Sequence, residues 1–332
     1  KEKVLPISIA CWQNGRLVPF RLRELGITPP RGAGNVGALD PALVHEFARE
    51  TAAYLRAVAR RLELSIRCIA IDAPQAPASA AGVRRAAELA LDAAGVSCFA
   101  TPSDEGFERI RKKVQTHLTA GGAEGALPHA NQLWMLVGFA LFKELSEVAP
   151  CIEVFPQATV RAIGSGVVHK SRAGAVEDQL RAAAAFTGWP NPALGESLSA
   201  CVWGSAHDQL DAYLSAWVAA LDEGERAALG TPPHDAIWVP RTNAMDRRFV
   251  VEPRPPEVVV QRAEARPRRL TSEPSIRPDN PVVCPACGEH TFQRWPWGWD
   301  AHAAHRCRGL MAEDPVARKA EYRTRFARLF RG

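Results

Sequence analysis

The chain has 332 residues and a net charge of +5, with 47% hydrophobic and 23% charged residues. This composition is typical of a globular protein with one large domain or two smaller ones. The sequence contains no run of about 18 uncharged apolar residues, and its first residues lack the apolar stretch of a signal peptide. These features argue against a membrane protein and against a secreted one.

The cysteines also argue against a secreted protein. Five of the eight are scattered singly, mostly in apolar segments, where a free cysteine behaves as a small hydrophobic residue. The other three cluster with histidines near residues 284–307, which is typical of a metal site in a reducing environment. We therefore expect a cytoplasmic protein without a membrane partner.

The predicted elements begin with a β-hairpin, because the apolar runs 4–11 and 17–22 flank the turn pair Asn14-Gly15. Asp40 then predicts a helix start before an amphipathic segment. A compact apolar run over 66–71 predicts a buried strand. The sequence further predicts helices over 83–94, 103–118, 131–148, 175–187 and 206–221, and strands over 97–100, 151–155, 237–239 and 249–251. A hairpin followed by strands alternating with helices is typical of a three-layer α/β fold with a mixed sheet.

The composition changes after this α/β region. Residues 252–280 are rich in proline and arginine and poor in apolar residues, which predicts a linker between a domain over 1–251 and a small module over 281–332. Many of the basic residues lie in or beside these segments: Arg241, Arg247, Arg248, Arg254, Arg262, Arg266, Arg268, Arg269, Arg318, Lys319, Arg323, Arg325, Arg328 and Arg331. This pattern favours contact with a nucleic acid, DNA or RNA, although a solvated linker and tail would have the same composition.

Four acidic residues lie at positions where packing of a hydrophobic core does not call for a charged side chain. Asp72 ends a buried strand, Glu153 interrupts another, and Asp208 and Asp211 lie three apart on one helix, so that they share a face. Carboxylates converging from two strands and a helix can hold Mg²⁺ or Mn²⁺ and activate a water against a phosphodiester.

Each acid also has a structural alternative. Asp72 could form a turn before Ala73-Pro74, and Asp208 could cap its helix. Glu153 could pair with a buried arginine, Arg84 or Arg85. These two arginines are also candidates for binding substrate phosphate, and so is Lys170, unless it is a solvated loop lysine.

The order of four motifs resembles the domain-of-unknown-function family 429, which is described as predicted RNase H-like nucleases. The resemblance covers roughly residues 4–250. The motifs are IAIDAP at 69–74, RRAAE at 84–88, IEVFP at 152–156 and HDQLDA at 207–212. The aspartates of the last motif also look like the last-helix acids of Holliday-junction resolvases. The resemblance implies an RNase H-like fold and a divalent-metal nuclease site using Asp72 and Asp208 or Asp211, with Glu153 close by.

RNase H-like folds carry their first catalytic aspartate on the first strand, before the hairpin. This sequence has no aspartate before Asp40. Two alternatives follow from the resemblance: the first strand precedes Lys1, or the site is incomplete and inactive.

The C-terminal module carries the spacing of a zinc finger. Cys284 and Cys287 are two thiolates of a Cys-x2-Cys turn, and His302 and Cys307 follow at spacings familiar in fingers, with His305 as the alternative fourth ligand. Four protein ligands leave no open coordination position, so we expect a structural Zn²⁺. The module and the basic helix predicted over 316–330 would bind nucleic acid or a protein partner.

The combined interpretation is a metal-dependent nuclease acting on DNA or RNA. The alternative is a catalytically inactive RNase H-like scaffold that binds nucleic acid or protein. A phosphotransferase on the same fold is the weakest hypothesis, because the glycines near residues 32–34 and 121–122 do not form a phosphate loop before a helix.

Overall fold

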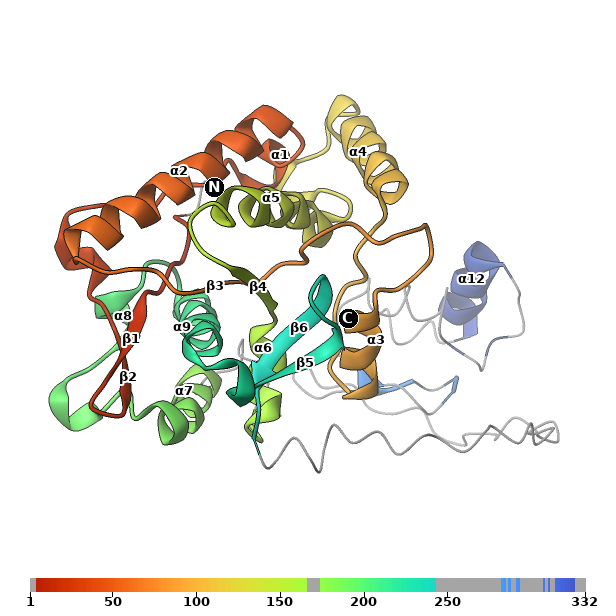
Figure 1. Ribbon diagram of the computed structural model, residues 1–332. Coiled ribbons are helices and arrows are strands. Elements are labelled where there is room, and N and C mark those ends of the chain that lie inside the picture. Colours follow the sequence, from red (N-terminus) through yellow and green to blue (C-terminus); the bar gives the residue numbers. More distant parts are fainter. Residues whose placement is uncertain are drawn as a thin grey trace. The chain divides into compact units, whose positions relative to one another are not determined.

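The computed structural model divides the chain into two compact units, residues 1–254 and 255–332. It describes residues 4–165 and 174–242 in the first unit, and residues 282–284, 286–287, 291–292, 307, 310 and 314–325 in the second. The boundary between the units falls within the predicted linker, whose residues 252–280 lie outside the described residues. We describe each unit by itself (Figure 1).

The predicted N-terminal hairpin is confirmed. Strands β1 (Ala10–Gln13) and β2 (Arg16–Pro19) pair antiparallel across a two-residue turn. Asn14 and Gly15 have φ angles of 51° and 74°, the left-handed values that a tight hairpin turn requires and that asparagine and glycine tolerate. The first strand begins at Ala10 rather than near Val4.

The main sheet has four strands in the order β3-β4-β6-β5. Strands β3 (Ile69–Ile71), β4 (Cys151–Val154) and β6 (Asp235–Pro240) run parallel, and β5 (Arg226–Thr231) pairs antiparallel with β6. Helices flank this mixed sheet, which confirms the predicted α/β class (Figure 1).

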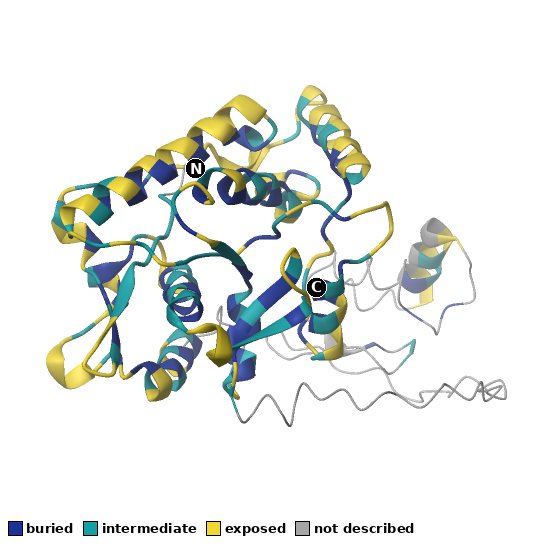
Figure 2. Cartoon of the chain, in the orientation of Figure 1, coloured by how far each residue is buried: buried dark blue, intermediate teal, exposed yellow. Residues whose placement is uncertain are grey.

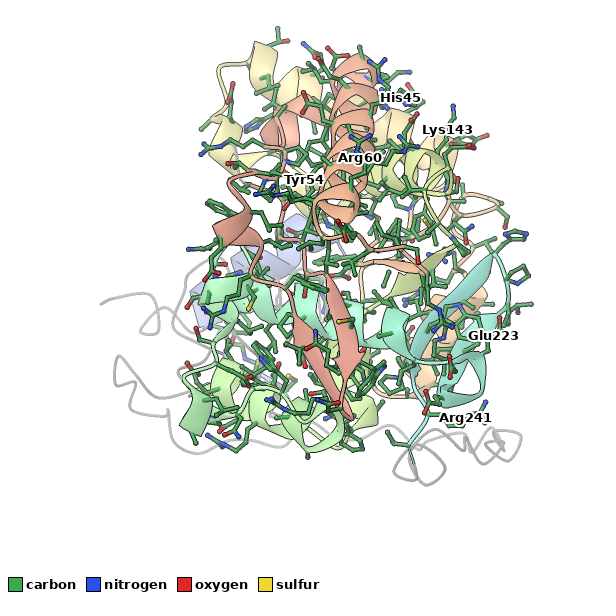
Figure 3. All side chains as sticks on the ribbon, turned by 60° about the vertical axis from the view of Figure 1, so that its left-hand side comes forward. His45, Tyr54, Arg60, Lys143, Glu223 and Arg241 are labelled. Carbon is green, nitrogen blue, oxygen red and sulfur yellow. The ribbon has the colours of Figure 1, made fainter. Side chains whose placement is uncertain are left out.

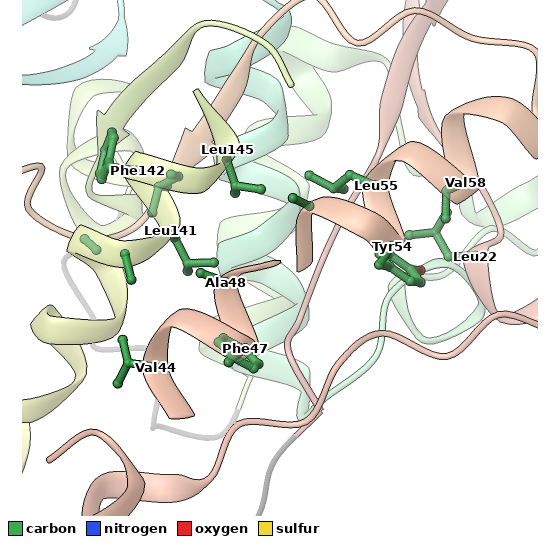
Figure 4. Close-up of a cluster of buried hydrophobic side chains, with 14 residues drawn as sticks. Leu22, Val44, Phe47, Ala48, Tyr54, Leu55, Val58, Leu141, Phe142 and Leu145 are labelled. Carbon is green, nitrogen blue, oxygen red and sulfur yellow. The ribbon is translucent and has the colours of Figure 1, made fainter. Parts of the chain in front are cut away.

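Two long helices cover one face of β3. Helix α2 (Pro41–Arg61) begins after Asp40, whose side chain accepts a hydrogen bond from the backbone N–H of Ala42 at 2.8 Å. It packs against α5 (Ala130–Leu145), and their apolar faces bury a common core with Ile71. Figure 2 shows the buried stripe along α2, and Figure 4 shows the side chains that fill this core.

Helix α9 (Ala206–Ala220) packs against the opposite face of β3 and against the hairpin. The hydroxyl of Tyr213, which is fully buried, shares its one hydrogen between the carbonyl oxygens of Leu17 at 3.1 Å and Trp189 at 3.4 Å. This side chain therefore holds together three distant segments of the chain.

Two shorter helices, α3 (Ala86–Ala93) and α6 (Pro156–Ala162), pack on β5 and β6. The approach of α3 to β5 is close, because a Cβ added to Gly230 would lie 2.6 Å from the backbone nitrogen of Ala87. Gly230 also has a φ of 109°, which side chains rarely adopt. The remaining elements of this unit are α1 (Gly34–Gly37), α4 (Asp104–Thr119), α7 (Ala175–Thr187), α8 (Leu198–Cys201) and the 3-10 turns η1 (Leu22–Leu25), η2 (Glu124–Ala126), η3 (Pro192–Leu194) and η4 (Glu223–Glu225).

Three elements differ from the sequence prediction. Residues 97–100 form no strand; Phe99 is 58% exposed, and no described strand pairs with this segment. Strand β5 and helix α6 were not predicted from the sequence. The predicted strand over 249–251 lies outside the described residues.

The described part of the second unit contains a short antiparallel pair, β7 (Val282–Val283) and β8 (Thr291–Phe292), and the helix α12 (Pro315–Arg325). Across both units, the described helices include none with the length and apolar character needed to cross a membrane.

Candidate functional site

A cavity of about 1580 Å³ opens in the first unit between the hairpin and the main sheet. Its lining comes from the segment that leads into β1, from β1 and β3, and from α2, α5 and α9. Much of this lining is apolar, and acidic side chains stand among it.

Three of the predicted site residues line this one cavity: Asp72, Asp208 and Asp211. Asp72 follows the last residue of β3 directly and is exposed. Asp208 and Asp211 lie one turn apart on α9, which begins at Ala206. Strand β3 and the helix that packs on it therefore place carboxylates more than 130 residues apart in sequence along one cavity.

The carboxylate of Asp208 is held by its neighbours. Ser205 Oγ donates a hydrogen bond to its Oδ2 at 2.5 Å, and His207 Nε2 lies 3.3 Å from its Oδ1. Ser205, not Asp208, occupies the capping position of α9, so the capping alternative for Asp208 does not describe its place in the helix. These contacts fix the orientation of the carboxylate at the rim of the cavity.

Glu153 lies elsewhere. It is 5% exposed, and its two oxygens accept hydrogen bonds from Arg85 at 2.9 and 2.6 Å. Burial raises the pKa of Glu153, and the hydrogen bonds from Arg85 oppose that effect. The ion pair is the alternative that the sequence left open for Glu153, and Glu153 is not among the residues that line the cavity.

Glu153 is nevertheless linked to the segment after β3. Its Oε2 also accepts a hydrogen bond from the backbone N–H of Gln75 at 3.0 Å. Gln75 lies three residues beyond Asp72, so the buried carboxylate anchors the loop that carries the exposed one.

The two candidate phosphate-binding arginines make internal ion pairs. Arg85 is buried and also pairs with Asp235, with 3.2 Å between Nε and Oδ1. Arg84 contacts Glu88 at 3.3 Å and Asp92 at 2.5 Å along α3. Neither lines the cavity, so neither is placed to bind a ligand within it. Lys170 lies outside the described residues.

Asp235 is a structural residue that the sequence analysis missed. Its carboxylate accepts hydrogen bonds from the backbone N–H groups of Ala86 at 2.7 Å and Ala87 at 3.2 Å, at the N-terminus of α3. No local motif reveals this cap, because its acceptor comes from the start of β6, almost 150 residues later.

Among the described residues, one set of at least three possible metal ligands converges, and it lies in the second unit. It comprises Cys284, Cys287 and Cys307, whose sulfur atoms lie within 4.8 Å of one another. The cavity carboxylates of the first unit do not form such a set in this conformation.

The sulfur atoms of Cys284 and Cys307 are 3.8 Å apart. A disulfide would need about 2.04 Å, whereas two thiolates on a tetrahedral zinc ion, each about 2.3 Å from the metal, are about 3.8 Å apart. The three sulfurs therefore fit zinc. The predicted fourth ligand, His302 or His305, lies outside the described residues.

A tyrosine that the sequence analysis did not single out completes this cluster. Tyr322 on α12 is 1% exposed, and its hydroxyl lies 3.4 Å from Cys284 Sγ. Burial raises the pKa of Tyr322, which keeps the hydroxyl protonated and able to donate to a thiolate. Arg318 on the same helix donates a hydrogen bond to the carbonyl oxygen of Cys307. Helix α12 is thus tied to the cysteine cluster through two side chains.

Comparison with known proteins gives one match. The model of a family described as "Protein of unknown function (DUF429)" matches residues 29–235, which is more than half of the chain and includes β3, β4 and α9. No curated protein and no solved structure matches. The match covers the strand and helix that present the cavity carboxylates, and the chain belongs to the DUF429 family.

Proposed function

We propose that this protein is a divalent-metal-dependent nuclease that hydrolyses phosphodiesters of DNA or RNA. The observation that carries the proposal is the position of Asp72, Asp208 and Asp211 around one cavity. Carboxylate oxygens are the ligands that Mg²⁺ and Mn²⁺ prefer. The family resemblance stated from the sequence motifs points to the same chemistry.

In this proposal Asp72 and Asp211 hold the ion, which would supply an activated water and neutralise charge on the phosphodiester. Ser205 and His207 orient the carboxylate of Asp208 beside Asp72 and Asp211. We assign Glu153 to positioning rather than to metal binding, because Arg85 already occupies both of its oxygens. Arg85 then acts as its partner and not as a phosphate ligand.

The test is cleavage of labelled single-stranded, double-stranded and branched DNA and RNA by the full chain, with Mg²⁺, with Mn²⁺ and with a chelator. Asp72→Asn and Asp211→Asn keep side-chain size while removing charge, and we expect each to lower the rate at least about 100-fold. The matched control is Asp178→Asn, because Asp178 is an exposed helical aspartate that does not line the cavity and forms a surface ion pair with Arg181. It should cut like the unchanged chain.

Cutting that depends on metal and is lost in both cavity variants, but not in the control, would establish the nuclease. Cutting that survives both substitutions would assign the activity to other residues or to a contaminant. If no substrate is cut while nucleic acid still binds, the nuclease proposal fails.

The second candidate is a catalytically inactive scaffold that binds nucleic acid or protein. The observation that favours it is that the described carboxylates of the cavity do not converge as a set of three ligands. In both cases we propose that zinc on Cys284, Cys287, Cys307 and His302 or His305 folds the C-terminal module, which then captures a nucleic acid or protein partner. The other described cysteines, Cys11, Cys68, Cys98, Cys151 and Cys201, form no disulfide, which fits our proposal of a cytoplasmic protein.

A further inference from the structure

Helix α12 is attached to its unit through a buried tyrosine. Among the side chains of α12 that the structure describes, Tyr322 alone is buried, with 1% exposed. The 11 residues of this helix would be only marginally helical in isolation, because a helix shorter than about 12–15 residues does not offset the cost of forming its first turn. The order of α12 therefore depends on what Tyr322 contacts.

The hydroxyl of Tyr322 lies against the cysteine cluster. It is 3.4 Å from Cys284 Sγ, and Cys284 is fully buried. Either atom can donate the hydrogen while the cysteine is a thiol. A cysteine that binds a metal ion does so as a thiolate, which has no proton, and the hydroxyl of Tyr322 is then the donor.

Binding of metal should strengthen this contact. A hydrogen bond to a charged acceptor is roughly twice as strong as one between neutral groups, and burial removes the water that would compete for it. Without metal, the same two atoms form a neutral contact in which sulfur is a weak partner. The difference between the two states lets a metal ion stabilise the docked position of α12.

A second side chain holds the same face of α12 to the cluster. Arg318, four residues before Tyr322, donates a hydrogen bond to the carbonyl oxygen of Cys307. Residues four apart lie on one face of a helix, so this face is turned toward both Cys284 and Cys307. Cys307 is fully buried as well. Two of the three described ligands thus contact α12 directly.

We propose that Tyr322 couples metal in the cysteine cluster to the order of helix α12. The coupling acts in both directions, because the factor by which metal stabilises the docked helix is also the factor by which the docked helix strengthens metal binding. The inference rests on the zinc site of the proposed function and not on the nuclease activity. The partner capture proposed for this module would then respond to metal, since α12 carries the basic residues Arg318, Lys319, Arg323 and Arg325.

The first measurement is the absorption spectrum of the full chain loaded with Co²⁺, whose thiolate ligands give a charge-transfer band. The variant is Tyr322→Phe, which keeps the buried ring and removes the hydroxyl. A hydrogen bond stabilises the electrons of a thiolate, so its loss should move the band to longer wavelength. A role of Tyr322 in packing alone would leave the band where it is.

The second measurement is hydrogen exchange at the amides of α12, with Zn²⁺ and with a chelator. In the unchanged chain, chelation should speed this exchange. The ratio of the two rates should be about tenfold smaller in Tyr322→Phe, because a hydrogen bond to a charged group is lost. Competition with a chelator should show that Zn²⁺ binds this variant about tenfold more weakly, as reciprocity requires.

The matched control is Tyr54→Phe. It also removes a buried tyrosine hydroxyl, but in the first unit, and it should leave the band, the exchange ratio and the zinc affinity unchanged.

The outcomes separate this inference from the zinc proposal. Failure of the unchanged chain to bind Co²⁺ or Zn²⁺ would overturn both. If metal binds and Tyr322→Phe behaves as the unchanged chain does, the coupling is overturned and the zinc site stands. A shifted band without any change at α12 would also overturn the coupling, because Tyr322 would then act on the metal without holding the helix.

Discussion

At the scale of single residues, acidic residues with similar sequence surroundings differ in how far the fold buries them. Asp72 directly follows β3 and Glu153 lies within β4, but Asp72 is exposed at the cavity and Glu153 is buried against Arg85. A buried carboxylate requires such a partner, because an unpaired charge there costs several kcal/mol. The sequence could name both the acid and its two candidate partners. It could not choose between them, because α3 must first be placed on the sheet.

Tyr54 on α2 gives a prediction at this scale (Figures 3 and 4). It is 5% exposed, and its hydroxyl is buried without a hydrogen-bond partner among the described residues. Removing an unsatisfied buried hydroxyl removes a desolvation cost, so Tyr54→Phe should raise the free energy of unfolding at pH 7 by about 1 kcal/mol. Urea unfolding checks this, and a loss of stability would mean that the hydroxyl has a partner.

The same substitution should change the response to alkali. Burial raises the pKa of Tyr54 from 10.0 to about 12. A folded-state pKa above the unfolded value gives a stability that is complete below pH 10 and is lost as the pH rises toward 12. The unchanged chain should therefore lose up to about 2 kcal/mol more than Tyr54→Phe between these pH values. Equal losses in the two proteins would contradict this explanation.

At the scale of elements, clear local sequence patterns were sufficient to predict secondary structure. The helical spacing predicted α7 over its full observed range, and the Asn14-Gly15 turn predicted the hairpin. The sequence Arg226–Thr231 gave no strand signal, because its alanines suit a helix equally well. It forms β5 because β6 is available as a partner and α3 covers it.

The contact between β5 and α3 gives a prediction for an element. Gly230→Ala would place a Cβ within 2.7 Å of three backbone atoms, at a φ of 109°. We expect a loss of about 3 kcal/mol in the free energy of unfolding, from backbone strain together with separation of α3 from the sheet. Gly224→Ala is the matched control, since a Cβ there meets nothing within 4 Å. Similar urea midpoints for the two variants would argue against a close approach.

At the scale of the whole molecule, the chain consists of two units with different sources of stability. The first has extended apolar cores. In the described part of the second, three cysteine sulfur atoms lie close enough together to bind a metal ion such as zinc. Small modules of this kind depend on their metal. The sequence spacing predicted Cys284, Cys287 and Cys307 together, but not Tyr322, because no local rule links it to them.

Removal of metal should therefore affect one unit only. In the full chain, a strong chelator should make three additional thiols reactive toward a thiol reagent, those of Cys284, Cys287 and Cys307. The urea midpoint of the first unit, followed by far-UV circular dichroism, should stay unchanged. Zinc should restore protection. Thiols that react equally with and without chelator would show that they hold no metal.

The hydrogen bond from Tyr213 to the carbonyl oxygen of Leu17 spans 196 positions of the chain. During synthesis from the N-terminus at about 5–20 residues per second, the hairpin leaves the ribosome roughly 10–40 s before its partner helix does. Throughout that interval Leu17, which the finished protein buries completely, has no α9 to cover it. Until α9 has been made, the newly made hairpin therefore lacks the helix that covers Leu17 in the finished protein.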